Sequence, residues 1–508
     1  MKGRVYLVGA GPGDYKLLTL KGLECIKEAD VIVYDRLVNI NYLREAKPNC
    51  EFIYVGKASS NHAMPQDDIN RIISDKAKEG KVVTRLKGGD PYVFGRGGEE
   101  GEFLVNEGID FEVVPGITSA IGGLCYAGIP ITHRGYASSF HVITGHLRED
   151  DKESEELKWN ALANVKGTLV FLMGVANLNK IINNLIKEGK SKDTPVALIS
   201  WSTRYNQRVI TSTLENIYET AKKENVKPPT LIVIGDVVNL RDKLNFFEKK
   251  PLFGKSIMVT RSRNQSSSLV QKISDLGGNP IEIPTIKIDK IENNTELENE
   301  INNIKHYTYL VLSSQNAVDI FFDKLDEMNL DCRCLSNIKI CAIGSATANA
   351  MKNRGIKADI VPKKFVTESL YEELVQIVNE NDNILIPRAK NARDFLVSKL
   401  SEKCNVKEVH TYETILDDSS KNEIINLLES KEVDYITFSS SSTVKNFIDI
   451  IGSNNIDRLQ NVKIISIGPI TTKTAEELNL NIYKESKKST IDEMINTIIE
   501  DKDLVKVN

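Results

Sequence analysis

The sequence predicts an α/β protein whose two halves are each built from strand–loop–helix units. Residues 4–14 (RVYLVGAGPGD) form a predicted strand that runs into a glycine-rich loop, and a helix follows. The apolar run at 29–35 (ADVIVYD) is typical of a buried parallel strand. In the second half, three strand–loop elements recur in the same order. Together these observations indicate an α/β fold with parallel sheets.

Apolar runs predict the remaining strands of the first half and its end. These strands are expected at 81–89, 111–116, 141–145, 168–174, 195–200 and 229–238. Residues 246–254 (FFEKKPLFG) then break the apolar periodicity with a charged stretch that contains Pro and Gly. The pattern restarts at 255–261 (KSIMVTR). We therefore predict one domain region at 1–245, a linker at 246–254 and a second region at 255–508.

The second half contains an internal repeat of three elements. MVTRSRN, LVLSSQNAV and ICAIGSATA recur as LIPRAKN, ITFSSSSTV and IISIGPITT at nearly constant spacing. Each element is a strand that leaves through small residues into a helix, and such strand ends present backbone N–H groups to ligands. Two similar lobes that face one cleft are the natural inference.

Composition limits the classes of protein that the chain can represent. At 508 residues it is too long for a single core, and 41% apolar with 27% charged residues is ordinary for a globular protein. A net charge of −4 argues against general nucleic-acid binding. No apolar run is long enough to span a bilayer, and the chain starts in a strand rather than a signal peptide. Seven sparse cysteines are read as reduced thiols, so we expect a cytoplasmic protein. Neither the histidines nor Cys332 and Cys334 have metal-ligand spacing, and we predict no metal.

The loop GAGPGD superficially matches a dinucleotide-binding loop. Two details argue against that interpretation. Pro12 removes a backbone N–H from the loop that would hold a diphosphate, and Asp14 places a carboxylate where the third glycine would stand. A ligand without phosphates fits this loop better.

Ten blocks in order carry a more specific signal. They are GAGPGD, YDRLV, VGK, RLKGGDPYVFGRGGEE, VVPGITSA, GIPITHR, TGH, TLVFLMG, PVALIS and IVIGDVV. The chain from 1 to about 245 resembles the tetrapyrrole methyltransferase family, specifically uroporphyrinogen-III C-methyltransferase. The resemblance implies a two-lobed α/β enzyme, with lobes at about 1–112 and 113–245, that is usually a homodimer. It also implies S-adenosylmethionine as cofactor and transfer of two methyl groups to uroporphyrinogen III, which gives precorrin-2.

The resemblance implies a set of cofactor-binding residues between the lobes. They are Pro12, Gly88, Gly89, Asp90, Val93, Thr118, Ser119 and Met173. The carboxylate of Asp90 can accept hydrogen bonds from ribose hydroxyls or an ammonium group. Met173 offers an adaptable apolar surface, although a core methionine is an equally good interpretation. Where the family usually has Gly-Thr, this chain has Ser202-Thr203, so Ser202 is the least typical member of the set.

Asp35 and Lys57 match the family's proton acceptor and proton donor. The alternatives are a strand-end carboxylate paired with Arg36 and a solvated surface lysine. The eight carboxylates of uroporphyrinogen need cations, and guanidinium groups bind carboxylates well. We therefore expect substrate contacts from Arg36, Arg96 and Arg134, and basic residues in or beside the same motifs add Arg85, Lys87 and Arg148.

The second half, over about 255 to 508, resembles uroporphyrinogen-III synthase through the order of its motifs. The resemblance implies two domains joined by a two-stranded connection, 255–288 with 414–508 and 289–413. It implies cyclisation of hydroxymethylbilane with inversion of the last ring, in which Tyr412 assists departure of the hydroxyl group. The expected substrate-binding residues are Arg261, Ser313, Thr347, Arg388, Ser439 and Thr471. The Ser and Thr residues open helices, so they are also candidate N-caps.

Three other functions remain open from the sequence. The first is a methyltransferase of the cobalamin branch with another acceptor. The second is a second half that binds tetrapyrroles without turnover. The third, a nicotinamide dehydrogenase, has the least support because of the loop chemistry above.

Overall fold

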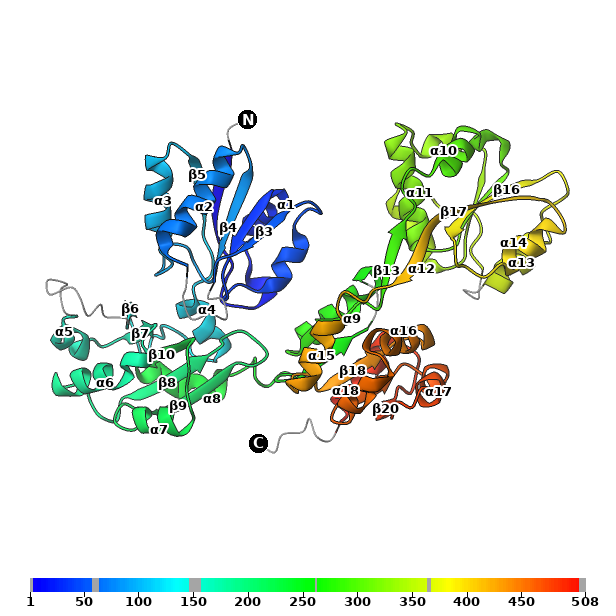
Figure 1. Ribbon diagram of the computed structural model, residues 1–508. Helices are drawn as coiled ribbons and strands as arrows, with labels where there is room; N and C mark the ends of the chain where they lie inside the picture. Colours follow the sequence, from blue (N-terminus) through cyan, green and yellow to red (C-terminus); the bar gives the residue numbers. More distant parts are fainter. Residues whose placement is uncertain (1–2, 57–63, 146–156, 261–262, 363–366, 502–508) are drawn as a thin grey trace. The chain divides into compact units, whose positions relative to one another are not determined.

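A computed structural model describes residues 3–56, 64–145, 157–260, 263–362 and 367–501. The described strands form four sheets of five strands each (Figure 1). By packing, the chain divides into two compact units, Met1–Ile257 with Leu269–Ile281 and Ile495–Asn508, and Met258–Ser268 with Glu282–Met494. None of the described helices is long and apolar enough to cross a membrane.

The first sheet has the order β3-β2-β4-β1-β5, and all its strand pairs are parallel. Its strands are β1 (Arg4–Gly9), β2 (Val31–Tyr34), β3 (Glu51–Tyr54), β4 (Val82–Lys87) and β5 (Asp110–Val114). Its helices are α1 (Leu20–Glu28), α2 (Gln66–Lys78) and α3 (Gly97–Asn106). Along β1, Leu7 and Val8 enter different core clusters because successive side chains point to opposite faces. Both faces are therefore buried, and the loops that follow the parallel strands meet at one edge of the sheet.

The second sheet, β6-β7-β10-β8-β9, is mixed. Its strands are β6 (Phe140–Thr144), β7 (Thr168–Leu172), β8 (Pro195–Ser200), β9 (Arg208–Thr213) and β10 (Thr230–Ile234). β6 and β7 are parallel, whereas β10 runs antiparallel to β7 and β8, and β8 antiparallel to β9. Its helices are α4 (Ser119–Tyr126), α5 (Trp159–Asn164), α6 (Leu178–Lys187), α7 (Ile217–Lys223) and α8 (Arg241–Leu244). The apolar runs predicted four of these strands without their direction, because strands buried on both faces look alike either way. The polar strand β9 was not predicted.

The second half contains the other two sheets. One has the order β12-β11-β18-β19-β20, from β11 (Ser256–Val259), β12 (Asn279–Glu282), β18 (Tyr435–Phe438), β19 (Lys463–Ser466) and β20 (Lys484–Glu485). The other has the order β13-β17-β16-β14-β15, from β13 (Ile286–Lys290), β14 (Tyr309–Leu312), β15 (Lys339–Ala342), β16 (Asn383–Ala389) and β17 (Asn405–Leu416). The helices are α9 (Arg263–Asp275), α10 (Thr295–Asn302), α11 (Gln315–Glu327), α12 (Ser345–Asn353), α13 (Thr367–Leu374), α14 (Phe395–Ser401), α15 (Lys421–Glu429), α16 (Ser441–Ile451), α17 (Pro469–Glu477) and α18 (Ile491–Ile499).

Two antiparallel strands connect the two sheets of the second half. The chain leaves through β13 and returns through β17, which pair from Ile286 with Leu416 to Lys290 with Tyr412. The domain limits expected at 288/289 and 413/414 fall inside these two strands. The two-stranded connection is thus present, and each limit lies within a strand rather than in a loop.

The internal repeat is confirmed by strand order. The repeated elements are β11 and β16, β14 and β18, and β15 and β19, and in both sheets they lie side by side in the order β11-β18-β19 or β16-β14-β15. β11 comes first along the chain in its sheet, whereas β16 comes after β14 and β15. β11 and β16, the strands of the first repeated element, therefore differ in their order along the chain.

The junction at 246–254 is not a solvated linker. Phe247 and Leu252 are buried at 3% and 0% exposure. The ring of Phe247 also lies 5.4 Å from that of Phe253. The charged residues Glu248, Lys249 and Lys250 are consecutive, and apolar residues on either side of them enter the core, so the predicted linker is packed.

Candidate functional site

The glycine-rich loop after β1 is joined to the loop after β4 by backbone hydrogen bonds. Gly11 N donates to Gly89 O over 3.1 Å, and Gly89 N donates to Gly11 O over 2.8 Å. Ala10 N donates to Lys87 O over 2.7 Å, and Pro12 has no N–H to offer. Most of the amides that would hold a diphosphate are therefore engaged within the protein, which supports a ligand without phosphates.

Asp14 links the glycine-rich loop to the second lobe. Its carboxylate accepts a hydrogen bond from Lys16 N at 2.8 Å, which caps a short 3₁₀ helix, and another from the Tyr126 hydroxyl at 2.8 Å. Its own N–H donates to Thr203 Oγ1 at 2.9 Å. Burial and this carboxylate together raise the pKa of Tyr126. Asp14, in the third glycine position, therefore holds the glycine-rich loop against the second lobe.

The expected cofactor residues after β4 and before α4 meet at the same sheet edge. Asp90 Oδ2 accepts from Gly116 N at 3.0 Å and Oδ1 from Tyr92 N at 2.8 Å. Thr118 is the N-cap of α4, and its hydroxyl oxygen accepts from Ala120 N at 3.3 Å. Thr118 and Ser119 thus begin a helix whose free N–H groups face this edge. Asp90 holds the preceding loop in place and keeps lone pairs for a ligand.

Gly9, Pro12 and Val93 complete this edge. A Cβ on Gly9 would lie 2.5 Å from Gly116 Cα, so the end of β1 and the loop after β5 approach too closely for a side chain. Pro12 packs against α4, since its Cγ lies 3.0 Å from the position of a Cβ on Gly122. Val93 N donates to Asp90 O at 3.4 Å, and the Val93 side chain is half-buried.

A cavity of about 590 Å³ lies beside this edge, between loops of the two lobes. It brings together Arg96 and Met173, which the sequence assigned to substrate and cofactor respectively. Its lining residues are Pro91, Tyr92, Phe94, Arg96, Gly97, Gly98, Glu99, Thr144 and Met173. Met173 is 54% exposed, so its interpretation as a core methionine is wrong. Arg96 forms an ion pair with Glu99 at 2.5 Å and remains exposed at the cavity.

Unusual backbone geometry gathers around the same loops. Among described non-glycine residues, positive φ angles outside asparagine occur at Phe94 (53°), Arg96 (58°), Met173 (58°), Trp201 (47°), Thr203 (66°) and Lys431 (55°). All but Lys431 follow strands of the first half. Residues held in this region without being Gly or Asn concentrate at functional sites. The geometry therefore marks these loops independently of the motifs.

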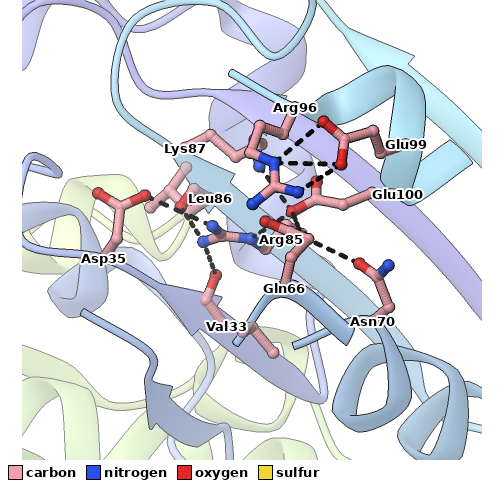
Figure 2. A network of polar contacts seen from close by, with 10 residues as sticks. All are labelled: Val33, Asp35, Gln66, Asn70, Arg85, Leu86, Lys87, Arg96, Glu99 and Glu100. Carbon is pink, nitrogen blue, oxygen red and sulfur yellow. Dashed lines mark hydrogen bonds and ion pairs between the residues drawn. The ribbon is translucent and has the colours of Figure 1, made fainter. Parts of the chain in front are cut away.

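Asp35, the expected proton acceptor, is half-buried at the end of β2. Its Oδ1 accepts from Leu37 N at 3.0 Å, and its Oδ2 lies 3.5 Å from an Nη of Arg85. Figure 2 shows Arg85 between Asp35 and Glu100. The alternative in which Asp35 pairs with Arg36 is wrong, because Arg36 lies over the ring of Trp201, 5.9 Å from its centroid.

Arg85 and Lys87 are not surface cations for the substrate. Each is 4% exposed, and both point to Glu100, which is 1% exposed. Glu100 Oε1 accepts from Lys87 Nζ at 2.6 Å and from Arg85 Nε at 3.3 Å (Figure 2). Burial, with Arg85 nearby, lowers the pKa of Lys87 to about 8. Both basic residues occupy alternate positions on β4 and so share one buried face.

Other expected site residues of the first half lie apart from the cavity or outside the described residues. Arg134 is exposed. Lys57 and Arg148 fall outside the described residues, so the structure does not place them. Ser202 is 7% exposed and packs under α4, where a Cβ on Gly123 would meet its Oγ at 2.7 Å. Thr203, rather than Ser202, contacts the glycine-rich loop.

In the second half, Tyr412 is 5% exposed, and its hydroxyl lies 2.9 Å from Ser314 Oγ. Ser314 is the N-cap of α11, and Ser440 is the N-cap of α16 with a full capping box. The expected caps Ser313 and Ser439 each stand one residue too early. These serines are half-buried at the ends of β14 and β18.

Thr347, Thr471 and Arg388 are more buried than expected. The two threonines are the third residues of α12 and α17, exposed at 5% and 4%, and Gly344 and Gly468 hold the cap positions. Arg388 is 4% exposed, and its guanidinium donates to Asp394 and Glu408 at 2.5 Å each. The guanidinium of Arg388 therefore stabilises its own lobe. Arg261 falls outside the described residues.

Sequence reasoning missed four residues that organise these sites. They are Glu100, Thr203, Arg204 and Ser314. Arg204 donates to Leu37 O at 2.7 Å and lies over the Trp201 ring, 5.1 Å from its centroid. A signal existed for Glu100, because two basic residues inside an apolar strand require a buried acid. No local signal predicts that Thr203 reaches a loop 189 residues away.

Comparisons with known proteins match each half separately. The family model of tetrapyrrole (corrin/porphyrin) methylases matches residues 4–218, and that of uroporphyrinogen-III synthase HemD matches residues 267–496. The porphyrin biosynthesis protein HemD of Ruminiclostridium josui is 42% identical over 98% of both chains. The uroporphyrinogen-III C-methyltransferase of Priestia megaterium is 54% identical over 47% of this chain and 99% of its own.

Among solved structures, uroporphyrin-III C-methyl transferase of Thermus thermophilus complexed with S-adenyl homocysteine is 40% identical. It covers 47% of this chain and 94% of its own, with a TM-score of 0.40. A mutant uroporphyrinogen III synthase of the same organism is 16% identical over 48% of this chain and 96% of its own, with a TM-score of 0.35.

Proposed function

The chain belongs to the family that joins a tetrapyrrole methylase to a uroporphyrinogen-III synthase, and we propose that it catalyses two consecutive reactions. The second half cyclises hydroxymethylbilane to uroporphyrinogen III with inversion of the last ring. The first half then transfers two methyl groups to that product, which gives precorrin-2. The observation that carries this proposal is the 42% identity to a porphyrin biosynthesis protein across 98% of both chains.

S-adenosylmethionine is the proposed cofactor of the first half. When bound, it supplies a methyl group on a sulfonium. The loop chemistry fits it, because the amides of Ala10, Gly11 and Asp14 are engaged and no diphosphate cradle is left. The N-terminus of α4 and the remaining lone pairs of Asp90 suit its polar groups, and the exposed Met173 suits its apolar surface.

In the methyl transfer, the protein holds the acceptor carbon in line with the methyl group and moves protons on the macrocycle. We propose Asp35 as proton acceptor and Lys57 as proton donor. Arg85 keeps the Asp35 carboxylate oriented from the buried side. Arg96 at the cavity, with the exposed Arg36 and Arg134, binds substrate carboxylates.

In the cyclisation, the Tyr412 hydroxyl donates a hydrogen bond to the departing hydroxyl group of the linear substrate. Its position 2.9 Å from Ser314, at the start of α11, places it beside free helix N–H groups that suit substrate carboxylates. Ser313 and Ser439, at equivalent strand ends, are proposed to contact the same carboxylates.

The test is an anaerobic incubation of the full chain with hydroxymethylbilane and S-adenosylmethionine, followed by product mass and ring isomer. A type III macrocycle with two added methyl groups supports both reactions. Unmethylated type III product refutes the methyl transfer, and the type I ring alone refutes the cyclisation. Replacing the acceptor with other tetrapyrroles tests the cobalamin-branch alternative.

We also propose that the chain is a cytoplasmic homodimer that associates through its methyltransferase half. This rests on the family resemblance and on the absence of disulfides among the described cysteines. Light scattering on the full chain tests the homodimer, because a monomer mass at micromolar concentration contradicts it.

A further inference from the structure

Glu248, in the junction between the two halves, is tied to the methyltransferase half. Its side chain is 17% exposed and forms an ion pair with Arg241 at 2.5 Å. Glu248 Oε1 accepts from Gln207 Nε2 at 2.9 Å, and Oε2 accepts from Asn245 Nδ2 at 3.1 Å. The junction therefore contributes a fixed carboxylate to the turn that follows β8.

Gln207 passes this contact on to the turn at 201–204. Gln207 is 5% exposed, and its Oε1 accepts from Thr203 N at 2.9 Å. Thr203 is 2% exposed and has φ 66°, a conformation that β-branched residues avoid. Its hydroxyl oxygen in turn accepts from Asp14 N at 2.9 Å. A continuous chain of hydrogen bonds thus runs from Glu248 to the glycine-rich loop.

A second path from the junction ends at the same residue. The ring of Tyr126 packs on Phe246 and Phe247, with centroids 5.6 and 4.7 Å away. The Tyr126 hydroxyl donates to Asp14 at 2.8 Å. Gln207 Nε2 also donates to Tyr126 O at 3.2 Å, which joins the two paths. Both paths converge on Asp14, next to Pro12 and Gly13 of the loop.

We propose that Glu248 is a positioning residue of the methyltransferase: through Gln207 and Thr203 it fixes the glycine-rich loop in the shape that binds the cofactor. Without the carboxylate, the Gln207 amide keeps only its longer hydrogen bond to Tyr126 O at 3.2 Å, so it is held less firmly and the unfavourable conformation of Thr203 loses part of its support. The inference rests on the proposed function, because it takes this loop as the S-adenosylmethionine site. It adds that part of that site is built by the junction.

The experiment compares three variants of the full chain, Glu248→Ala, Glu248→Gln and the control Glu112→Ala. Glu112 is also a partly buried carboxylate paired with a guanidinium, that of Arg4, in the same half. Calorimetry measures the dissociation constant of S-adenosylhomocysteine, and kinetics separate kcat from the KM of S-adenosylmethionine. Hydrogen exchange follows peptides that contain the amides of Asp14 and Thr203. Cyclisation by the same chain is an internal control for the second half.

Glu248→Ala is expected to raise the dissociation constant of S-adenosylhomocysteine about tenfold and the KM of S-adenosylmethionine by a similar factor. The value of kcat should stay within about twofold of wild type. Exchange at Asp14 and Thr203 accelerates, and cyclisation is unchanged. Glu248→Gln keeps an amide oxygen that Gln207 can donate to, so its dissociation constant should lie between those of wild type and Glu248→Ala. Glu112→Ala behaves as wild type.

An unchanged dissociation constant in Glu248→Ala overturns the inference, as does an equal loss in Glu112→Ala. If Glu248→Ala does not fold, Glu248→Gln decides, because it is isosteric and must still bind more weakly than wild type. A wild-type chain that neither binds S-adenosylhomocysteine nor transfers methyl groups refutes the proposed function itself. That result is distinct from a working enzyme that is insensitive to Glu248.

Discussion

The buried charge of Lys87, at the end of β4, destabilises the folded chain by an amount that depends on pH. Lys87 is 4% exposed, and its main acceptor, Glu100 Oε1, is shared with Arg85 and Gln66. The second oxygen of Glu100 is buried and has no hydrogen-bond partner within the described part of the chain. Glu100 must therefore serve Lys87 together with Arg85, which has a second and more distant carboxylate in Asp35, and burial of Lys87 lowers its pKa.

The pH dependence of stability should reveal this lysine. Between pH about 8 and 10.5, Lys87 is neutral in the folded chain but protonated in the unfolded chain, so the unfolded state binds more protons. The folded state therefore gains stability as pH rises through this window. Relative to Lys87→Met, the wild type should gain about 3 kcal/mol across it. Urea unfolding followed by tryptophan fluorescence measures this, because both tryptophans, Trp159 and Trp201, lie in the first half.

The exposed lysine variant Lys192→Met serves as the control for that titration. Lys192 pairs with Glu215 at the surface, so its replacement removes no buried charge. Wild type and Lys87→Met curves that run parallel from pH 8 to 10.5 would contradict the assignment of the buried charge to Lys87.

Tyr412→Phe tests the second active site by removing one hydroxyl group. We expect kcat for cyclisation to fall by about tenfold or more, because a hydrogen-bond donor to the leaving group is lost. The type I fraction of the product should rise, since spontaneous closure then competes. The rate of methyl transfer to supplied uroporphyrinogen III should not change. Product isomers and both rates are measured on the same preparation.

Tyr307→Phe is the matched change, since the hydroxyl of Tyr307 donates to Glu300 at 2.6 Å in the same lobe. It should leave cyclisation unaffected. Equal cyclisation rates for wild type and Tyr412→Phe would show that the Tyr412 hydroxyl only forms a hydrogen bond with Ser314 and does not assist the reaction.

At the scale of elements, adjacent serines before α16 have different roles. Ser440 caps the helix, and its Oγ accepts from Thr443 N at 3.3 Å, while Ser439 directly follows β18. Ser440→Ala should lower the free energy of unfolding by about 1 kcal/mol, and Ser439→Ala should lower it by less than about 0.5 kcal/mol. Hydrogen exchange in the first turn of α16 measures the difference. Ser439→Ala should instead raise the KM of hydroxymethylbilane, and the opposite pattern would exchange the two roles.

Sequence patterns predicted elements best where one signal sufficed. Apolar runs located β1, β2 and β7, and recurring motifs located the equivalent strands of the second half. β9 was missed because four of its six residues, RVITST, are polar. The two serine caps were misplaced by one residue, because SSQ and SSSS offer several hydroxyl groups and the backbone conformation selects one of them.

The candidate site was predictable where motifs coincide with strand ends. Asp90 and Thr118 lie in the loops at one edge of the first sheet and Met173 lines the cavity, while their roles in cofactor binding stay predictions. The need for a buried acid near Arg85 and Lys87 was predictable, but which residue supplies it was not. Arg85 and Arg388 resembled substrate-binding cations, yet their acceptors come from other elements, Glu100 on α3 and Glu408 on β17. Such pairings depend on packing that local sequence does not encode.

For the whole molecule, the junction separates two places where extra chain should have different effects. A six-residue Gly-Ser insertion between Asn245 and Phe246 separates Asn245 from Glu248, which exchange two hydrogen bonds. We expect this insertion to weaken the binding of S-adenosylhomocysteine at least about tenfold. Gly254 is exposed, has φ 78° and has open space around its Cβ position. The same insertion after Gly254 should change the affinity for S-adenosylhomocysteine less than about twofold.

Both insertions keep every residue of the chain, so cyclisation should continue in each. Binding of S-adenosylhomocysteine that is equally strong in the two insertion variants would mean that residues 246–254 act as an ordinary linker. Equal weakening would mean that continuity of the chain matters rather than the contacts of Glu248.

The exchanged strand order of the second half determines when its parts can fold during synthesis on the ribosome. The sheet β13-β17-β16-β14-β15 lies within 286–416 and is complete once β17 has emerged. β11 must wait for β18, and the Thr260 hydroxyl donates to Thr437 O across 177 residues. Closing so long a loop is slow. A nascent chain that stalls before residue 435 therefore exposes one edge of β11, whose Ile257, Met258 and Val259 are fully buried at the end. Synthesis of β18 is therefore what covers this edge and protects the strand from aggregation.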